Sequence, residues 1–264
     1  MAHNDFGGLH DDLRLTDASL RRRALLRLAL GAGAMHLLGC SKDPAGLDDE
    51  GTPGNGSCST IPSETAGPYP GDGSNGPNVL GQSGVVRSDI RSSFAGLSGT
   101  AVGIPLVVTL TLVSQSNGCA PLPGRAIYLW HCDRAGLYSL YSAGATSQNY
   151  LRGVQQTNAQ GEVTFTTIFP GCYAGRWPHM HFEVYQSLAT ATSAGNKIVT
   201  SQLAIPKAAC DAVYATTGYA SSLTNLSQVS LASDNVFADG ASLQLATMGG
   251  NVVNGFTAAL QVSI

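Results

Sequence analysis

Short runs of β-branched and aromatic residues alternate with clusters of turn residues along most of the chain, and this pattern restricts the fold more than any other feature. The runs predict strands at 106–113, 126–130, 163–168, 179–185, 197–204 and 256–264. One short helix is expected over 207–215, directly after Pro206. Regularly spaced short strands with a single helix predict an all-β protein, with one β-sandwich domain over residues 61–264.

Composition and charge exclude several classes of protein. Charged residues make up only 12% of the chain, too few for a coiled coil or a long solvated helix. The net charge of −3 gives no basic surface, so no nucleic acid is expected as a partner. No apolar stretch reaches the roughly 20 residues of a membrane-spanning helix.

The first forty residues have the pattern of an export signal. Arg21 begins a basic triplet, and the apolar run of small residues that follows it, 24–38, is typical of a secretory signal. Residues 22–27 (RRALLR) resemble the twin-arginine export signal, and Leu37-Leu38-Gly39-Cys40 resembles a bacterial lipobox. An amphipathic N-terminal helix of the domain is the alternative interpretation.

This pattern predicts the organisation and location of the chain. Residues 1–40 are expected to be a twin-arginine-type signal with a lipobox, and residues 41–60, rich in Gly, Ser, Asp and Pro, a flexible linker. The protein is then exported to the periplasm or the cell surface and anchored in the membrane through a lipid on Cys40.

The cysteines fit an oxidising compartment, where disulfides persist. If Cys40 carries a lipid, five cysteines remain, so two disulfides and one free thiol is the maximum. Cys119 and Cys132 flank one predicted strand and are expected to lie too far apart to join. We expect a disulfide between Cys172 and Cys210, and the alternative is that Cys172 is a metal ligand.

Two histidines share one face of a predicted strand. Because side chains alternate along a strand, His179 and His181 point to one side, and the apolar residues Met180, Phe182 and Val184 point to the other. Two imidazoles over a packed backing predict a metal site on a rigid element. The alternative is a pair of surface histidines.

The remaining histidines add one candidate. Of six histidines, three lie within the predicted signal, which leaves His131 besides the pair at 179 and 181. His131 is either a third metal ligand or a residue with a structural hydrogen bond.

A phenol and a cation accompany the histidine pair. Tyr173 and Arg176 lie within nine positions of His181. A phenolate, a guanidinium and two imidazoles fit a ferric site better than a hydrophobic core, because Fe(III) prefers hard oxygen ligands and accepts imidazole.

Five segments together resemble the intradiol ring-cleavage dioxygenases, a family of non-haem iron(III) enzymes that cleave catechols. They are 63–69 (SETAGPY), 128–139 (YLWHCDRAGLYS), 151–155 (LRGVQ), 166–173 (TTIFPGCY) and 176–182 (RWPHMHF). They occur in the order found in the family, and the resemblance extends from about residue 63 to residue 210. Short exported, lipoprotein-like members are the most similar, and the helical dimerisation domain of the catechol-type enzymes has no counterpart here.

The resemblance implies a ligand set and two further functional residues. The implied metal ligands are Tyr138, Tyr173, His179 and His181. Tyr173 would also act as an internal base, and Arg176 would stabilise negative charge on the bound substrate. Gln202 matches the glutamine of the family that lies behind the ligands. Tyr141 is a rival to Tyr138, which we prefer because it holds the Gly-x-Tyr-Ser position.

The sequence departs from the family in two places. Trp177 stands where the family often has proline, so it is expected to reshape the pocket. Residues 186–197 form an insert that separates His181 from Gln202 more than is usual.

The resemblance implies an Fe(III)-dependent dioxygenase that cleaves a catechol-type ring between its two hydroxyls with O2 and yields a muconate-type diacid. The particular diol and the oligomeric state stay open, and an oligomer is compatible with the sequence. Two alternatives remain: a zinc hydrolase built on the two histidines, and an exported β-sandwich surface lipoprotein with a binding role.

Overall fold

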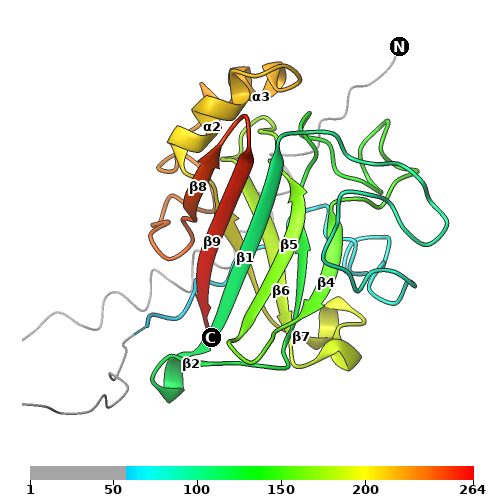
Figure 1. The fold of residues 1–264 in the computed structure, drawn as a ribbon, viewed down its shortest axis with the longest axis vertical. Helices are drawn as coiled ribbons and strands as arrows, with labels where there is room; N and C mark the ends of the chain where they lie inside the picture. Colours follow the sequence, from blue (N-terminus) through cyan, green and yellow to red (C-terminus); the bar gives the residue numbers. More distant parts are fainter. Residues whose placement is uncertain (1–57) are drawn as a thin grey trace, which may run out of the picture.

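The computed structural model describes residues 58–264 as two facing β-sheets (Figure 1), which confirms the predicted all-β sandwich. The first sheet has the order β2-β1-β9-β8, with β5 paired to β1. Its strands are β1 (Pro105–Ser114), β2 (Ala120–Pro121), β5 (Glu162–Ile168), β8 (Thr247–Asn251) and β9 (Gly255–Ser263). The second sheet has the order β4-β3-β6-β7. Its strands are β3 (Ala126–Trp130), β4 (Arg152–Gln156), β6 (His179–Tyr185) and β7 (Lys197–Ala204).

All the predicted strands are present, with ends within one residue of the prediction. The sequence did not predict β2, β4 and β8. The first has only two residues, and the other two contain glycine and polar residues, which have low strand propensity. These strands form because a neighbouring strand, β1, β3 or β9, offers them hydrogen bonds.

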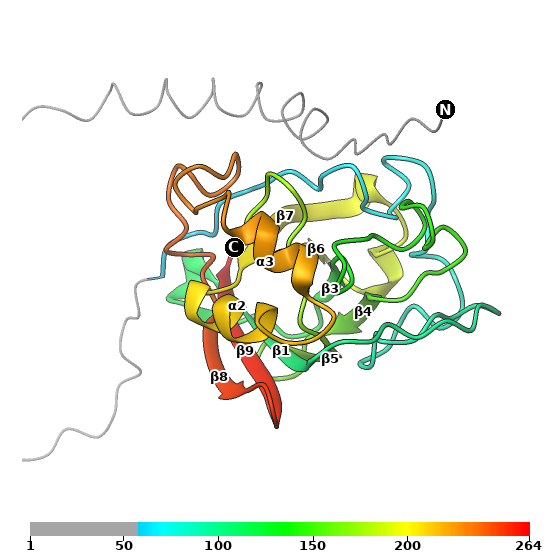
Figure 2. The same ribbon diagram turned by 90° about the horizontal axis from the view of Figure 1, so that it is seen from above.

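Two α-helices cover one open end of the sandwich (Figure 2). The predicted helix is α2 (Lys207–Tyr214), and a second one, α3 (Ala220–Leu226), was not predicted. The segment of α3 is short and rich in Ser, Thr and Asn, which are weak helix formers. The described part of the chain also contains three single-turn 3-10 helices: η2 (Gln115–Asn117), η3 (Leu188–Thr190) and η4 (Ala194–Asn196). Within residues 58–264, no helix has the length and apolar character needed to cross a membrane.

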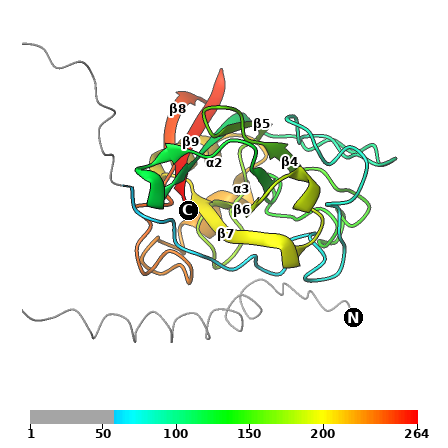
Figure 3. The same ribbon diagram turned by 90° about the horizontal axis from the view of Figure 1, so that it is seen from below.

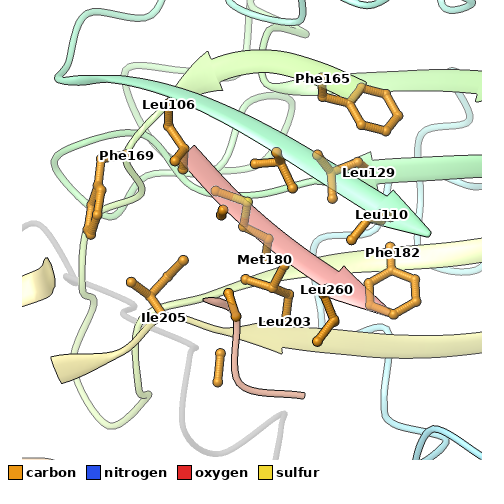
Figure 4. Close-up of a cluster of buried hydrophobic side chains, with 14 of the residues drawn as sticks. Leu106, Leu110, Leu129, Phe165, Phe169, Met180, Phe182, Leu203, Ile205 and Leu260 are labelled. Carbon is orange, nitrogen blue, oxygen red and sulfur yellow. The ribbon is translucent and has the colours of Figure 1, made fainter. Parts of the chain in front are cut away.

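The main hydrophobic core lies between the two sheets (Figure 4). From the first sheet, Leu106 and Leu110 of β1 and Leu260 of β9 point toward the second sheet, which contributes Met180 and Phe182 of β6. This confirms the apolar stripe predicted for β6. Because Met180 and Phe182 face this core, His179 and His181 face away from it.

A second cluster of buried residues covers the outer face of the β4-β3-β6-β7 sheet. It contains Tyr128, Trp130 and Tyr138 and lies under the chain that leads into the domain. That leading segment, residues 61–72, follows β7 (Figure 3) and is bound to it by hydrogen bonds such as Glu64 N–H to Thr200 O (2.8 Å). The second sheet is therefore buried on both faces, and the histidine pair lies inside the molecule.

The expected disulfide between Cys172 and Cys210 is wrong. Cys58 bonds to Cys119, with Cα atoms 5.9 Å apart, and Cys172 and Cys210 are free and buried. The thiol of Cys172 donates to the carbonyl of Arg176 instead. The disulfide also ties residues 58–60, the last part of the predicted linker, to the domain. The predicted signal, the lipobox and the rest of the linker lie outside the described residues.

Candidate metal centre

The two histidines of β6 bring their Nε2 atoms to 3.0 Å from each other. His179 Nδ1 lies 2.5 Å from the carbonyl oxygen of Trp177. A carbonyl only accepts, so Nδ1 carries the proton and Nε2 of His179 presents a lone pair. The ring of His181 stacks on Trp130, its register partner in β3, with centroids 4.9 Å apart and an angle of 7°.

Burial keeps both imidazoles neutral. Burial lowers the pKa of His179 well below its ordinary value, and nearby Arg176 lowers it further. Burial likewise lowers the pKa of His181, with neighbouring His179 as the next cause. Two neutral imidazoles with facing nitrogens are in the protonation state that metal coordination requires.

Two tyrosines complete the cluster. The hydroxyl of Tyr173, which is half-buried, lies 3.3 Å from His179 Nε2. Tyr138 is 1% exposed, and its ring centroid lies 5.8 Å from that of Tyr173. The Tyr138 hydroxyl is buried and has no hydrogen-bond partner among residues 58–264. Burial raises the pKa of Tyr138 well above its ordinary value, and Tyr173 is the next cause. A buried phenol without a partner needs a ligand to satisfy its oxygen.

Two glycines allow the tyrosine-bearing loops to pack together. Gly136 has φ +84°, and a Cβ there would lie 3.1 Å from Cβ of Tyr173. A Cβ on Gly171 would lie 2.7 Å from the carbonyl oxygen of Asp133. The amide of Gly171 donates to that same oxygen at 2.9 Å. These contacts place Tyr138, two residues after Gly136, beside Tyr173, two residues after Gly171.

Arg152 of β4 fixes the loop that carries Tyr138, although the sequence analysis gave it no role. Arg152 is 1% exposed, and its guanidinium donates hydrogen bonds to the hydroxyl (3.0 Å) and to the backbone carbonyl (2.9 Å) of Ser139. It also donates to the carbonyls of Tyr69 (2.9 Å) and Pro70 (2.7 Å) and to the hydroxyl of Tyr128 (3.1 Å). Its place in segment 151–155, one of the segments that resemble the family, was the signal that could have identified it. A buried arginine needs several acceptors, and Arg152 finds them on the chain around Tyr138.

Arg176 and Gln202 meet beside the histidine pair. Arg176 Nη2 donates to Gln202 Oε1 at 2.6 Å, and both side chains are buried. Gln202 of β7 is the direct register partner of His181. The sequence analysis missed Asp234, whose carboxylate accepts from Arg176 Nε at 3.0 Å.

The two departures from the family pattern leave the cluster intact. Trp177 does not line it: its indole packs in the main core and donates to the carbonyl of Ile205 at 2.8 Å. The insert at 186–197 forms the far end of the β6–β7 hairpin, with a register shift only between Val184 and Tyr185. The insert therefore does not move Gln202 away from His181.

Tyr141 and His131, the two rival ligands, are engaged elsewhere. The Tyr141 hydroxyl accepts from Gly71 N–H and donates to the carbonyl of Asn75, both at 2.8 Å. His131 lies 2.8 Å from the carbonyl of Cys132 through Nδ1 and 2.7 Å from Thr167 Oγ1 through Nε2. The geometry agrees with the preference for Tyr138 and with a structural hydrogen bond at His131.

The donor set fits a metal ion. In zinc–histidine sites each imidazole nitrogen lies about 2.1 Å from the ion, so two of them with a nitrogen–metal–nitrogen angle of about 90° would lie about 3 Å apart. The Nε2 atoms of His179 and His181 lie 3.0 Å apart, which matches this geometry. Within residues 58–264, no third His, Cys, Asp or Glu joins this pair. The other candidate donors are the phenols of Tyr138 and Tyr173, so the set is two nitrogens and two oxygens, suited to a hard oxidised metal.

Comparison with known proteins agrees with this geometry. Residues 87–188 match a family model described as "Dioxygenase", and this range contains all four candidate ligands and Arg176. An intradiol ring-cleavage dioxygenase from Tetranychus urticae has 25% identity and a TM-score of 0.60, covering 78% of this chain and 95% of its own. A second dioxygenase crystal structure has 25% identity and a TM-score of 0.62, covering 79% and 95%. A search of the curated proteins finds none that matches.

The β-sandwich and the buried cluster on its second sheet agree with an enzyme of the dioxygenase class. The family model and the two structures show that the chain is similar to dioxygenases, and in one case to an intradiol ring-cleavage dioxygenase. The resemblance drawn from the sequence segments is therefore confirmed.

Proposed function

We propose that this protein opens a catechol-type ring between its two hydroxyls, with O2 as the oxidant and Fe(III) as the resident metal, and gives a muconate-type diacid. The observation that carries the proposal is the convergence of two Nε2 atoms and two phenol oxygens in a buried cluster, with the Tyr138 hydroxyl left without a hydrogen bond. Phenolate oxygen is a good donor to ferric iron, and this donor set has no other evident use.

In this proposal four side chains hold the metal: Tyr138, Tyr173, His179 and His181. When bound, Fe(III) supplies Lewis acidity that favours the ionised form of a coordinated hydroxyl. Tyr173 is the ligand with partial solvent exposure, so it is the one placed to leave and accept a proton from an incoming diol. Tyr138 is fully buried and stays in place.

Arg176 is proposed to stabilise negative charge on the substrate ring. It is a planar cation, 1% exposed, and it is hydrogen-bonded to Gln202, the register partner of His181. In a site that excludes water, a fixed cation stabilises developing charge much more than it does in solution.

A two-histidine zinc hydrolase is the weaker candidate. It would leave Tyr138 and Tyr173 without a role, and it lacks a third His, Cys, Asp or Glu within residues 58–264. A surface lipoprotein with only a binding role would leave the entire cluster unexplained.

Visible spectroscopy and a ring-opening assay test the proposal together. Protein purified with iron should be red-brown, because tyrosinate donates charge to Fe(III), whereas a zinc-loaded or metal-free protein should be colourless. Catechol, protocatechuate, hydroxyquinol and chlorocatechols are then supplied in turn, and O2 uptake is measured with diacid formation. A colourless iron-loaded protein, or no ring opening on any diol, would refute the proposal.

We further propose that the protein is exported through its twin-arginine segment and anchored by a lipid on Cys40. The disulfide between Cys58 and Cys119 supports an oxidising compartment. Replacing Arg21, Arg22 and Arg23 with lysine should leave precursor in the cytoplasm. Cys40→Ser should release the protein from the membrane fraction, and unchanged fractionation would contradict the anchor.

A further inference from the structure

Asp234 is a fully buried carboxylate in the segment between α3 and β8, and its two oxygens serve different parts of the chain. Oδ1 accepts from the backbone N–H groups of Val236 (2.8 Å) and Phe237 (3.1 Å), which closes a local turn. Oδ2 accepts from Arg176 Nε (3.0 Å) and from the backbone N–H of Trp177 (2.7 Å). Only the second pair of bonds reaches the candidate metal centre.

Together with Gln202, this carboxylate holds the Arg176 guanidinium from two sides. The carboxylate of Asp234 accepts from Nε of Arg176, and Oε1 of Gln202 accepts from Nη2 at 2.6 Å. Gln202 is itself fixed, because its amide donates to the carbonyl of Thr65 at 2.9 Å. Two acceptors on different edges of a planar group determine both its position and its plane.

The charge of Asp234 points to orientation as its contribution. A carboxylate beside Arg176 reduces the positive potential that the guanidinium presents to an anionic substrate. The carboxylate also offsets the free-energy cost of burying the cation, since a buried charge without a partner is strongly destabilising. Asp234 weakens the electrostatic attraction between Arg176 and an anionic substrate. Any benefit of Asp234 to the reaction therefore comes from the position in which it holds the guanidinium.

The segment of Asp234 also reaches the histidine pair. The ring of Phe237 is 1% exposed, and its centroid lies 6.5 Å from that of His179. The turn closed by Asp234 Oδ1 thus places an apolar side chain beside one candidate ligand, while Oδ2 holds the cation.

We propose that Asp234 is a positioning residue of the ring-cleaving reaction, which acts by fixing the plane of Arg176. This inference rests on the proposed function, because it assigns Arg176 a role on the substrate. The structural alternative is that Asp234 only holds the C-terminal segment in place.

Asp234→Ser separates these two roles. A serine hydroxyl can still accept from the N–H groups two and three residues ahead, so the local turn is retained, but it is too short to reach Arg176. Asp234→Asn keeps the size of the side chain and removes its charge. Asp211→Asn is the matched control, because this carboxylate is exposed on α2 and pairs with Lys207.

The variants are compared as iron-loaded full-length protein with catechol as the probe. Removing a preorganised electrostatic group costs about 10²–10³ in kcat, and misplacing one should cost less, so we expect kcat to fall about 10-fold to 100-fold for Asp234→Ser and Asp234→Asn. Iron content, the visible band and the affinity for catechol under argon should stay within about threefold of the wild type. Asp211→Asn should match the wild type throughout.

A double-mutant cycle with Arg176→Ala tests whether Asp234 acts through Arg176. In the Arg176→Ala background, Asp234→Ser should lower kcat no further. An equal loss of kcat in both backgrounds, unchanged kcat in the single variants, or loss of iron in parallel with activity would each overturn the positioning role.

Failure of the proposed function gives a different result. Wild-type protein would then bind iron without opening catechol or any diol of the panel, and the positioning role would fall with it. Ring opening by the wild type, together with full activity in both Asp234 variants, overturns this inference alone.

Discussion

Tyr138→Phe is expected to stabilise the metal-free protein while impairing its metal centre. The Tyr138 hydroxyl is buried without a hydrogen bond, and an unsatisfied buried hydroxyl costs about 1–3 kcal/mol. Phenylalanine keeps the ring in its contacts with Tyr69 and Tyr173 and removes that penalty. For a domain of this size 1 kcal/mol shifts Tm by roughly 2–4 °C, so Tm of the metal-free protein should rise by about 2–12 °C.

Tyr141→Phe is the matched control and should behave in the opposite way. Its hydroxyl makes two hydrogen bonds of 2.8 Å, to Gly71 and Asn75. Losing two such bonds costs about 1–3 kcal/mol, so Tm should fall. This variant should keep the red-brown colour, which the variant at position 138 loses or shifts.

The assay is thermal unfolding of each metal-free variant by circular dichroism, followed by iron loading and visible absorption. A lower Tm for metal-free Tyr138→Phe would mean that its hydroxyl has a partner and that the reasoning from burial is wrong. Colour retained in Tyr138→Phe and lost in Tyr141→Phe would move the ligand to position 141.

Three further predictions concern the loops, the disulfide and pH. Gly171→Ala would place a Cβ within 2.7–2.8 Å of two backbone oxygens, so it should cost about 1–3 kcal/mol and lower iron content. Gly195→Ala, where the nearest heavy atom is 3.9 Å away, should change neither quantity. Replacing Cys58 and Cys119 with serine removes a crosslink over a sequence separation of 61, worth about 4 kcal/mol by loop entropy. Urea unfolding checks this value, and an unchanged midpoint would contradict it. Burial lowers the pKa of His131 from 6.5 to about 4. Between these pH values the imidazole of His131 is protonated in the unfolded chain and neutral in the folded one. This protonation of the unfolded chain removes about 3 kcal/mol of stability as pH falls, and His131→Gln should show a smaller loss between pH 7 and pH 4.5 by urea unfolding.

The strand that carries the histidine pair could be predicted because its signal is local. In β6, apolar and polar side chains alternate over seven residues, and that alternation alone puts His179 and His181 on one face. Gln202 could be transferred from the family pattern, although spacing alone could not show that the β6–β7 register pairs it with His181.

Other features depend on contacts between distant segments. The choice between Tyr138 and Tyr141 needs the hydrogen bonds that occupy the second hydroxyl. Asp234 lies 58 residues from Arg176, in a segment with no motif, so nothing in the sequence joins them. The disulfide was wrongly predicted because connectivity does not follow from the spacing of cysteines, and the Cys172 thiol is held by a carbonyl.

The two halves of the candidate metal centre differ in what supports them. Both histidines belong to a central strand, hydrogen-bonded on each side by β3 and β7, whereas both tyrosines stand on loops that touch through Gly136 and Gly171. Local opening starts from the least paired backbone, so the two loops should open as one cooperative unit well before β6 does. In hydrogen exchange their amides would share one rate, faster than that of the strand. A bound metal would then dissociate first from Tyr138 and Tyr173 and last from the two imidazoles.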